Sequence, residues 1–257
     1  MRVALGIEYN GSAFCGWQTQ PEVPNVQDTL ESALKAFATV PISTVCAGRT
    51  DTGVHATHQV VDFEAPVSRP MTAWVRGVNT FLPPSVAVRW AYEVPEDFSA
   101  RFSATERTYE YWLLNDPVRS PLTDGLVGWV FRPCDEVKMQ QAAQYLLGEH
   151  DFTSFRASEC QAKSPIRTMH EVTVKRTGKM IGIRLRANAF LHHMVRNIVG
   201  SLVYVGTGRE SVEWFKEVLE ARDPTFAAGG LYLVGVKYPN APYLPDYSPS
   251  LWAENLF

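Results

Sequence analysis

The amino-acid sequence predicts an α+β fold built from two ferredoxin-like halves, each with the element order β-α-β-β-α-β. Apolar residues that alternate along short segments indicate strands, and apolar residues three and four positions apart indicate helices. These patterns form one β-α-β-β-α-β series in residues 1–99 and a second one in residues 100–257. Two such halves can join their strands into one broad mixed sheet with helices on one face. We therefore expect an N-terminal α/β half over 1–99 and a C-terminal α/β half over 100–257.

The first half contains six predicted elements. Apolar residues alternate from Val3 to Tyr9, which is typical of a half-buried strand. Asn25 is suited to cap the following helix, and Pro83-Pro84 would end the second helix. Between the first strand and the first helix, Phe14 and Trp17 could either stack on nucleic-acid bases or cap the core. The predicted elements are a strand over 2–9, a helix over 26–39, strands over 43–46 and 57–65, a helix over 70–82 and a strand over 86–92.

The second half repeats this order. Asp135 can begin a helix that ends near Gly148, and Thr177-Gly178-Lys179 is typical of a hairpin turn. Ile183 lies at the centre of the second hairpin strand, on the face expected to meet the core. The predicted elements are a strand over 107–115, a helix from 135 to about 147, strands over 167–176 and 180–187, helices over about 190–205 and 211–221, and a strand over 230–236.

Composition indicates a soluble, cytoplasmic protein. The chain has 257 residues, of which 46% are hydrophobic and 20% are charged. Its apolar runs are shorter than a membrane span, and the sequence does not open with a basic and then apolar leader. The four cysteines are widely spaced, which favours reduced thiols over a disulfide or zinc framework.

The charge distribution bears on possible partners more than the net charge of −3 does. Residues 154–186 contain eight Lys or Arg and two Asp or Glu, a local net charge of +6. A segment of this kind is either a solvated basic face or part of a groove for a polyanion such as RNA. Arginine, which is suited to phosphate contact, supplies most of the basic residues.

The segment Ala47–Ala56, AGRTDTGVHA, is the leading candidate for a reactive site. It joins two predicted strands and places Arg49 two residues before Asp51. One interpretation is a β-turn in which Asp51 bonds to its own backbone. The other is a reactive loop in which Arg49 keeps the Asp51 carboxylate ionised, as a nucleophile must be.

Two other interpretations of these residues are disfavoured. Four of the six histidines, His55, His58, His192 and His193, suggest a metal site. An H-x-x-H pair without a partnered carboxylate motif is nevertheless a weak signal. Asp51-Thr52-Gly53 matches the D-T-G triplet of aspartic proteases. Those enzymes need two such triplets so that two carboxylates share a proton, and the sequence has one.

Tyr109 and Arg196 are candidates in the second half. Tyr109 shares a strand face with Tyr111, a position that is usually half-buried packing. Arg196 lies in an otherwise apolar helical segment, where it either extends outward to solvent or pairs with an acid. Asp51 is the carboxylate that we expect to face it.

The sequence resembles the TruA-type tRNA pseudouridine synthases along its whole length. The resemblance implies the pseudouridine synthase fold and conversion of uridine to pseudouridine at positions 38–40 of the tRNA anticodon arm, by a homodimer without a cofactor or metal. Ser99 departs from the family pattern, which usually has His there. The matching segments are GWQTQP (16–21), NVQDTLE (25–31), AGRTDTGVHA (47–56), ARFSATERTYEY (100–111), GEHDFTSFRA (148–157), QAKSPIRT (161–168), FLHHMVRNIVG (190–200) and GLYLVGVKYP (230–239).

The resemblance also implies roles for individual residues. Asp51 is similar to the catalytic aspartate of the family, Arg196 to its ion-pair partner, Tyr109 to the aromatic residue that covers the target base, and Leu231 to a residue lining the pocket. The remaining residues predicted to contact substrate are Arg49, Thr50, His55, Arg156, Lys163, Arg167, Lys175, Arg176 and Lys179.

The implied chemistry needs one ionised carboxylate and a base that removes the proton from C5 of uracil. Asp51 would act either as a nucleophile on the nucleotide or as a base at its sugar, and Tyr109 or a water would accept the C5 proton. The target uridine must leave its stack to reach Asp51. An alternative from another class is a non-catalytic RNA-binding module, since ferredoxin-like sheets commonly stack bases. It leaves Arg49, Asp51 and Arg196 without a role.

Overall fold

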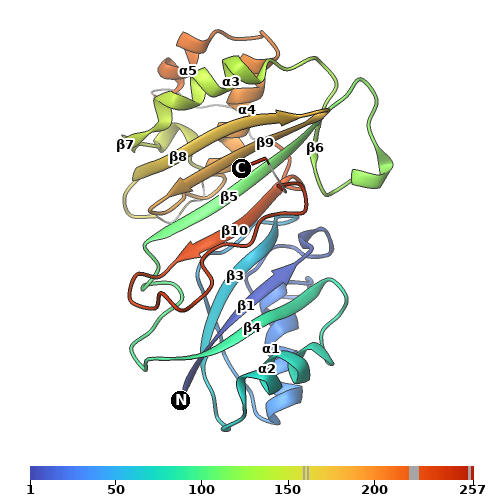
Figure 1. Ribbon diagram of the computed structural model, residues 1–257, viewed down its shortest axis with the longest axis vertical. Coiled ribbons are helices and arrows are strands. Elements are labelled where there is room, and N and C mark those ends of the chain that lie inside the picture. The colour runs from blue at the N-terminus through green and yellow to red at the C-terminus, as the bar shows by residue number, and fades with distance from the viewer. Residues whose placement is uncertain (159, 161, 220–225, 254–255) are drawn as a thin grey trace. The chain divides into compact units, whose positions relative to one another are not determined.

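The computed structural model describes residues 1–158, 160, 162–219, 226–253 and 256–257, and its described elements include ten strands and five α-helices (Figure 1). The strands are hydrogen-bonded in the order β4 (Val86–Val94), β1 (Arg2–Tyr9), β3 (His55–Glu64), β10 (Leu231–Lys237), β5 (Glu106–Asn115), β9 (Met180–Ala187), β8 (Ile166–Thr177) and β7 (Gly148–Asp151). Strand β2 (Val45–Cys46) pairs with β3, and β6 (Gly128–Val130) pairs with β5. The fold is therefore α+β with a mixed sheet, as predicted. Among the described residues, none of the helices is long and apolar enough to cross a membrane.

The chain divides into two compact units. Unit 1 contains Met1–Thr105 and Leu233–Ser248, and unit 2 contains Glu106–Tyr232 and Pro249–Phe257. Strand β10, Leu231–Lys237, therefore begins in unit 2 and ends in unit 1. The expected division of the chain between residues 99 and 100 stays a prediction.

Unit 1 has the strand order of a ferredoxin-like sheet, β4-β1-β3-β2, and the pairs β4–β1, β1–β3 and β3–β2 are antiparallel. Helix α2 packs along β4 and contacts α1, so the two helices form one layer. A short 3-10 helix, η1, covers Gly11–Ala13. The main elements are β1 (Arg2–Tyr9), α1 (Val26–Ala38), β2 (Val45–Cys46), β3 (His55–Glu64), α2 (Met71–Asn79) and β4 (Val86–Val94).

Local sequence explains why α1 forms where it does. The Asn25 side chain caps the helix by accepting a hydrogen bond from the Asp28 amide at 2.8 Å. Such a cap stabilises a helix by about 1 kcal/mol relative to alanine. Val26, Leu30 and Leu34 are fully buried along one face. The helix ends at Ala38, because its C-cap residue Thr39 has a left-handed backbone with φ of 65°.

The second series of strands repeats the same order, β10-β5-β9-β8, and β7 extends it beyond β8. Of β10, only Leu231 and Tyr232 belong to unit 2. Helices α3, α4 and α5 contact one another, and α3 packs on β8 (Figure 1). The hairpin turns at Gly178, whose φ is +57°, and Ile183 is fully buried, as predicted. The elements are β5 (Glu106–Asn115), η2 (Pro121–Thr123), β6 (Gly128–Val130), α3 (Glu136–Ala143), η3 (Gln144–Leu146), β7 (Gly148–Asp151), η4 (Thr153–Phe155), β8 (Ile166–Thr177), β9 (Met180–Ala187), α4 (Met194–Gly206), α5 (Val212–Val218) and β10.

Several boundaries differ from the prediction, and each has a local reason. Helix α4 begins at Met194 rather than near residue 190, because His193 has a left-handed backbone with φ of 61°. Helix α3 ends at Ala143 and continues as a 3-10 turn, while Gly148 begins β7 instead of closing the helix. The short strands β6 and β7 were not predicted, because three or four residues carry too little alternation to be recognised. The expected helix end at 220–221 lies outside the described residues.

Candidate active site

Asp51 lies in the loop that connects β2 to β3, where its side chain is half-buried. The loop turns tightly, since the Val54 amide donates to the Asp51 carbonyl at 3.1 Å and Gly53 has a φ of +76°. Arg49 is exposed on the same loop. The loop therefore presents an acid and a cation on a turn whose backbone is fixed.

A second loop, Gly11–Trp17, supports the Asp51 loop through main-chain contacts. The Trp17 amide donates to the Thr50 carbonyl at 2.9 Å, and the Gly53 amide donates to the Phe14 carbonyl at 3.3 Å. Gly16 has a φ of +91°, and a Cβ atom there would lie 2.8 Å from the Thr50 carbonyl oxygen. Glycine is therefore required at this position both for its backbone conformation and for the close approach of the two loops.

Phe14 and Trp17 are both buried, with 7% and 2% of their surface exposed. Of the two alternatives raised by the sequence, the structure supports the one in which these rings cap the core. Trp17 packs against Tyr9 with ring centroids 6.0 Å apart. The two aromatic side chains help to fix the loop that supports Asp51.

Thr50 and His55, which were predicted to contact substrate, are buried and hold the loop from inside. The Thr50 hydroxyl and the Tyr9 hydroxyl form a hydrogen bond of 2.7 Å. Nδ1 of His55 accepts a hydrogen bond from the Gly11 amide at 3.0 Å. A substrate contact for Thr50 or His55 stays a prediction, whereas the observed geometry gives each a partner within unit 1.

Gln59 holds the start of the loop. It lies in β3 and is fully buried, and its Nε2 donates to the Gly48 carbonyl at 2.6 Å while its Oε1 accepts from the Gly48 amide at 3.4 Å. The Ala47 amide also donates to the Val60 carbonyl at 2.8 Å. The sequence analysis missed Gln59 because a single polar residue within an apolar strand does not reveal its partner.

The candidate residues of unit 2 lie on β5, α4 and the start of β10. Tyr109 is 8% exposed, and its ring meets Phe190 edge-on at 5.0 Å. Leu231 is buried at the first position of β10. Nε of Arg196 donates to the Phe226 carbonyl at 2.8 Å. The ion pair expected between Arg196 and Asp51 stays a prediction, because Arg196 belongs to unit 2 and Asp51 to unit 1.

Arg196 also affects the electrostatics of its surroundings. Burial raises the pKa of Tyr111, and the positive charge of Arg196 opposes that rise. The Tyr111 hydroxyl donates to the Ala227 carbonyl at 2.7 Å. Arg196 is half-buried beside this neutral phenol, so it places a positive charge in a largely apolar part of unit 2.

The basic residues of 154–186 mostly have partners within unit 2. Among the described residues, four of them form ion pairs: Arg176 with Glu136, Lys179 with Asp116, Arg184 with Glu110, and Arg186 with Glu106 and Glu171. The hydrogen bond from Arg176 holds the pKa of Glu136 below its usual range, and the hydrogen bond from Lys179 does the same for Asp116. The local excess of positive charge in the sequence is thus offset by acids from other segments.

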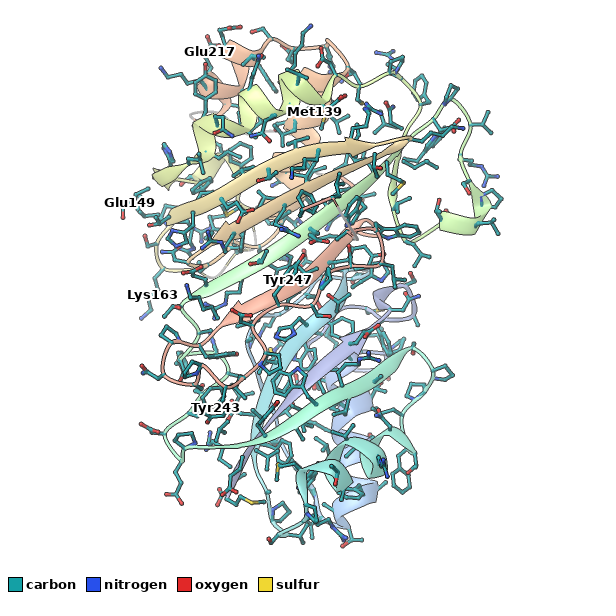
Figure 2. All side chains as sticks on the ribbon, viewed as in Figure 1. Met139, Glu149, Lys163, Glu217, Tyr243 and Tyr247 are labelled. Atoms are coloured by element: carbon teal, nitrogen blue, oxygen red, sulfur yellow. The ribbon has the colours of Figure 1, made fainter. Side chains whose placement is uncertain are left out.

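The remaining basic candidates differ in whether their side chains are bonded within the protein or exposed to solvent. Arg156 donates to the Cys160 carbonyl and to the Ala162 carbonyl, and Arg167 donates to two nearby carbonyls. Lys175 donates to the Leu256 carbonyl at 2.9 Å. Lys163 is exposed, and Figure 2 labels its position. The contact of these residues with RNA stays a prediction, and exposure favours Lys163.

The first pair of histidines has structural roles. Nε2 of His58 lies 2.9 Å from the Pro245 carbonyl, and burial lowers the pKa of His58. His55 is held by the Gly11 amide. In unit 2, the His192 and His193 rings lie 4.1 Å apart. His55 and His58 therefore connect β3 to neighbouring segments.

Comparison with known proteins identifies the family. A family model described as tRNA pseudouridine synthase matches residues 6–103 and 142–239. The chain belongs to the tRNA pseudouridine synthase family. It is an RNA pseudouridine synthase, an isomerase that converts uridine into pseudouridine.

Bacterial relatives in this family are similar to the chain over nearly its whole length. It is 56% identical over 244 residues to tRNA pseudouridine synthase A of Burkholderia multivorans, covering 93% of this chain and 90% of that one. It is 55% identical over 254 residues to the protein of the same name from Herminiimonas arsenicoxydans, with coverages of 95% and 92%. The match to the Janthinobacterium sp. protein is 54% over 256 residues, with coverages of 95% and 94%.

Among solved structures, the crystal structure of a Cbf5-Nop10-Gar1 complex gives a TM-score of 0.42 at 9% identity. The match covers 90% of this chain and 48% of the other.

The two segments of the chain that the family model matches contain most of the candidate residues. Asp51 and its loop lie in the first matched segment, and Arg196 and Leu231 lie in the second. Tyr109 lies between the two segments, so its assignment depends on the motif around it. Tyr9, whose hydroxyl bonds Thr50, also lies in the first matched segment, and the sequence analysis did not select it as a candidate site residue. The signal that could have drawn attention to it is its place at the end of an apolar strand, directly before a glycine-containing loop.

Proposed function

We propose that this synthase modifies uridines 38–40 in the anticodon arm of tRNA, as a cytoplasmic homodimer that needs no cofactor, with Asp51 as its catalytic residue. The observation that supports a catalytic role for Asp51 is the structure around it in unit 1. It is a half-exposed carboxylate on a loop that main-chain and buried side-chain hydrogen bonds hold in place. A preorganised nucleophile or base requires such a setting.

The proposed reaction breaks the N-glycosidic bond, rotates the uracil and joins C5 to the sugar. The Asp51 carboxylate either attacks the nucleotide or removes a proton from its sugar. Arg196 stabilises the ionised carboxylate, and Arg49 adds positive charge on the loop. The final step removes the C5 proton, with Tyr109 or a water as the acceptor. Each turnover exchanges one carbon–nitrogen bond for one carbon–carbon bond. It releases one C5 hydrogen to water, and N1 of the uracil takes up one proton, so the product is an isomer of the substrate.

The activity can be tested with a tRNA transcript that carries tritium at C5 of uridine. The purified protein should release tritium to water, and the release should persist in EDTA when monovalent salt maintains tRNA folding. Asp51→Asn should fold, bind tRNA within a few-fold of the wild type and release none, because asparagine has a similar shape and cannot ionise. Turnover by Asp51→Asn would refute the catalytic assignment. Binding of tRNA without release by the wild type would instead favour the non-catalytic module.

Three further measurements test the finer parts of the proposal. Mapping of pseudouridine in the product tRNA should place it at positions 38–40, and modification elsewhere would refute the anticodon assignment. Tyr109→Phe should lower tritium release steeply if the hydroxyl accepts the C5 proton, whereas full release would assign that role to water. Sedimentation at micromolar protein should give the mass of a dimer.

A further inference from the structure

Thr50, the residue directly before Asp51, is held at both its side chain and its main chain. Its hydroxyl is 2.7 Å from the Tyr9 hydroxyl, and both residues are buried. Its carbonyl accepts a hydrogen bond from the Trp17 amide at 2.9 Å. Because Thr50 and Asp51 share a peptide bond, these contacts restrict the backbone angles that determine where the Asp51 carboxylate points.

Tyr9 is a rigid anchor for this contact. It is the last residue of β1, a strand that pairs with β3 on one side and β4 on the other. The pairing of β1 with β3 shifts register between Ile7 and Tyr9. An irregularity of this kind re-aims a side chain relative to its strand. The Tyr9 ring packs on buried Trp17, so the hydroxyl has little freedom to leave Thr50.

The other side of Asp51 is also fixed, but by the main chain. The Gly53 amide donates to the Phe14 carbonyl and the Val54 amide donates to the Asp51 carbonyl, at 3.3 and 3.1 Å. Nδ1 of His55 holds Gly11, at the start of the supporting loop. Of the contacts to the Asp51 segment, the Tyr9–Thr50 bond is therefore one that a single substitution can remove while the main-chain contacts remain.

We propose that Tyr9 is a positioning residue for the Asp51 carboxylate and acts through Thr50. The inference rests on the proposed catalytic role of Asp51. A catalytic group must be held within about 0.5 Å of its productive position. A displacement of about 1 Å lowers the rate roughly a hundredfold. The Tyr9 hydroxyl supplies this restraint from the sheet, and Thr50 transmits it to Asp51.

The test is the single-turnover rate of tritium release at saturating enzyme, which separates chemistry from binding and product release. Tyr9→Phe keeps the ring and removes the hydroxyl, while Thr50→Val keeps the shape of Thr50 and removes Oγ1. Each should lower the rate about tenfold or more, in line with a displacement below 1 Å, with the tRNA dissociation constant unchanged within about twofold. The variant that combines Tyr9→Phe with Thr50→Val should lose no more of the rate than either single variant, because all three variants remove the same hydrogen bond. Thr50→Ser, which keeps the hydroxyl, should recover most of the rate that Thr50→Val loses.

Tyr238→Phe is the matched control. The Tyr238 hydroxyl is also buried in unit 1 and donates to the Ala100 carbonyl at 2.7 Å, so its loss has a similar effect on folding. This variant should keep the full rate at a temperature where the protein is folded. A full rate in Tyr9→Phe would overturn the proposal, and so would an equal loss in Tyr238→Phe, which would indicate general destabilisation. Wild-type activity and the Asp51→Asn variant, measured in parallel, separate either outcome from a failure of the proposed function.

Discussion

At the scale of single residues, the polar side chains buried around the Asp51 loop are used to hold main-chain atoms or one another. Tyr9 bonds Thr50, His55 bonds the Gly11 amide, and Gln59 bonds both polar atoms of Gly48. A buried polar group is unfavourable unless it is hydrogen-bonded, so each of these partners is energetically required. The consequence is a loop whose shape is maintained by side chains that face away from solvent.

His58 shows how such a contact responds to pH. Its ring joins β3 to the Pro245 carbonyl, and burial lowers its pKa below the ordinary value of 6.5, although the Pro245 carbonyl and Asp246 oppose this. The neutral form is therefore favoured in the folded state. The stability that depends on it is fully present above pH 6.5 and is lost as the pH falls through the folded pKa.

We therefore expect the free energy of unfolding of the wild type, measured by urea titration, to fall from pH 7.5 to pH 5.5 more than that of His58→Gln. Glutamine keeps a donor for Pro245 and cannot be charged. His170→Gln, at an exposed position in β8, should follow the wild-type curve. Parallel curves for His58→Gln and the wild type would show that His58 does not contribute to the pH dependence.

At the scale of elements, the two units share one strand order but differ in the connection between two of their strands. When the four strands of each series are numbered in chain order, both series have the order 4-1-3-2. The connection that differs between them joins the second strand of the series to the third. In unit 2 this is the tight turn at Gly178. In unit 1 it is the longer Asp51 loop, which needs the Gly11–Trp17 loop for support. The strand order therefore places the acidic connection of unit 1 and the basic connection of unit 2 at related positions of the two four-stranded series.

Two glycines provide a matched test of this support. Gly16→Ala and Gly178→Ala both place alanine at a positive φ, which lowers stability by about 1–2 kcal/mol. A Cβ atom at Gly16 would also meet the Thr50 carbonyl, whereas nothing lies within 4 Å at Gly178. We expect both variants to lose stability and Gly16→Ala alone to lose single-turnover activity, by about tenfold or more because Asp51 is displaced. Equal activities at a temperature where both are folded would show that the close approach of the loops has no catalytic effect.

At the scale of the whole molecule, some basic residues that were predicted to contact RNA form ion pairs within the protein. The sequence left open whether the segment 154–186 is a solvated basic face or part of a groove for a polyanion, and the structure pairs several of its cations with acids of unit 2. Arg176 in particular holds Glu136, the Cys134 carbonyl and Asn115. Positive charge along the sequence is therefore a poor measure of the charge available to tRNA.

This distinction predicts opposite results for two substitutions. Lys163→Glu, at an exposed position, should weaken tRNA binding and reduce the slope of log affinity against log salt by about one unit for a lost phosphate contact. Arg176→Gln should leave that slope unchanged and lower the free energy of unfolding by about 1–3 kcal/mol, because half-buried acceptors lose the hydrogen bonds of a charged donor. Anisotropy titrations at several salt concentrations and urea denaturation measure both. A reduced slope in Arg176→Gln with unchanged stability would return the hairpin to the RNA-binding surface.

The sequence by itself determined the order of the longer elements, the N-caps of α1 and α3, the candidate Asp51 loop and the family. These features are local, since alternation, helix caps and contiguous motifs depend on residues a few positions apart. Only the tertiary structure decided that β10 belongs to both units, that Thr50 and His55 face inward, and that Arg176 pairs with Glu136. The Tyr9–Thr50 bond joins residues 41 positions apart, and Arg176 and Glu136 are separated by 40. A partner at such a distance is selected by how strands and loops pack together, which local preference does not specify.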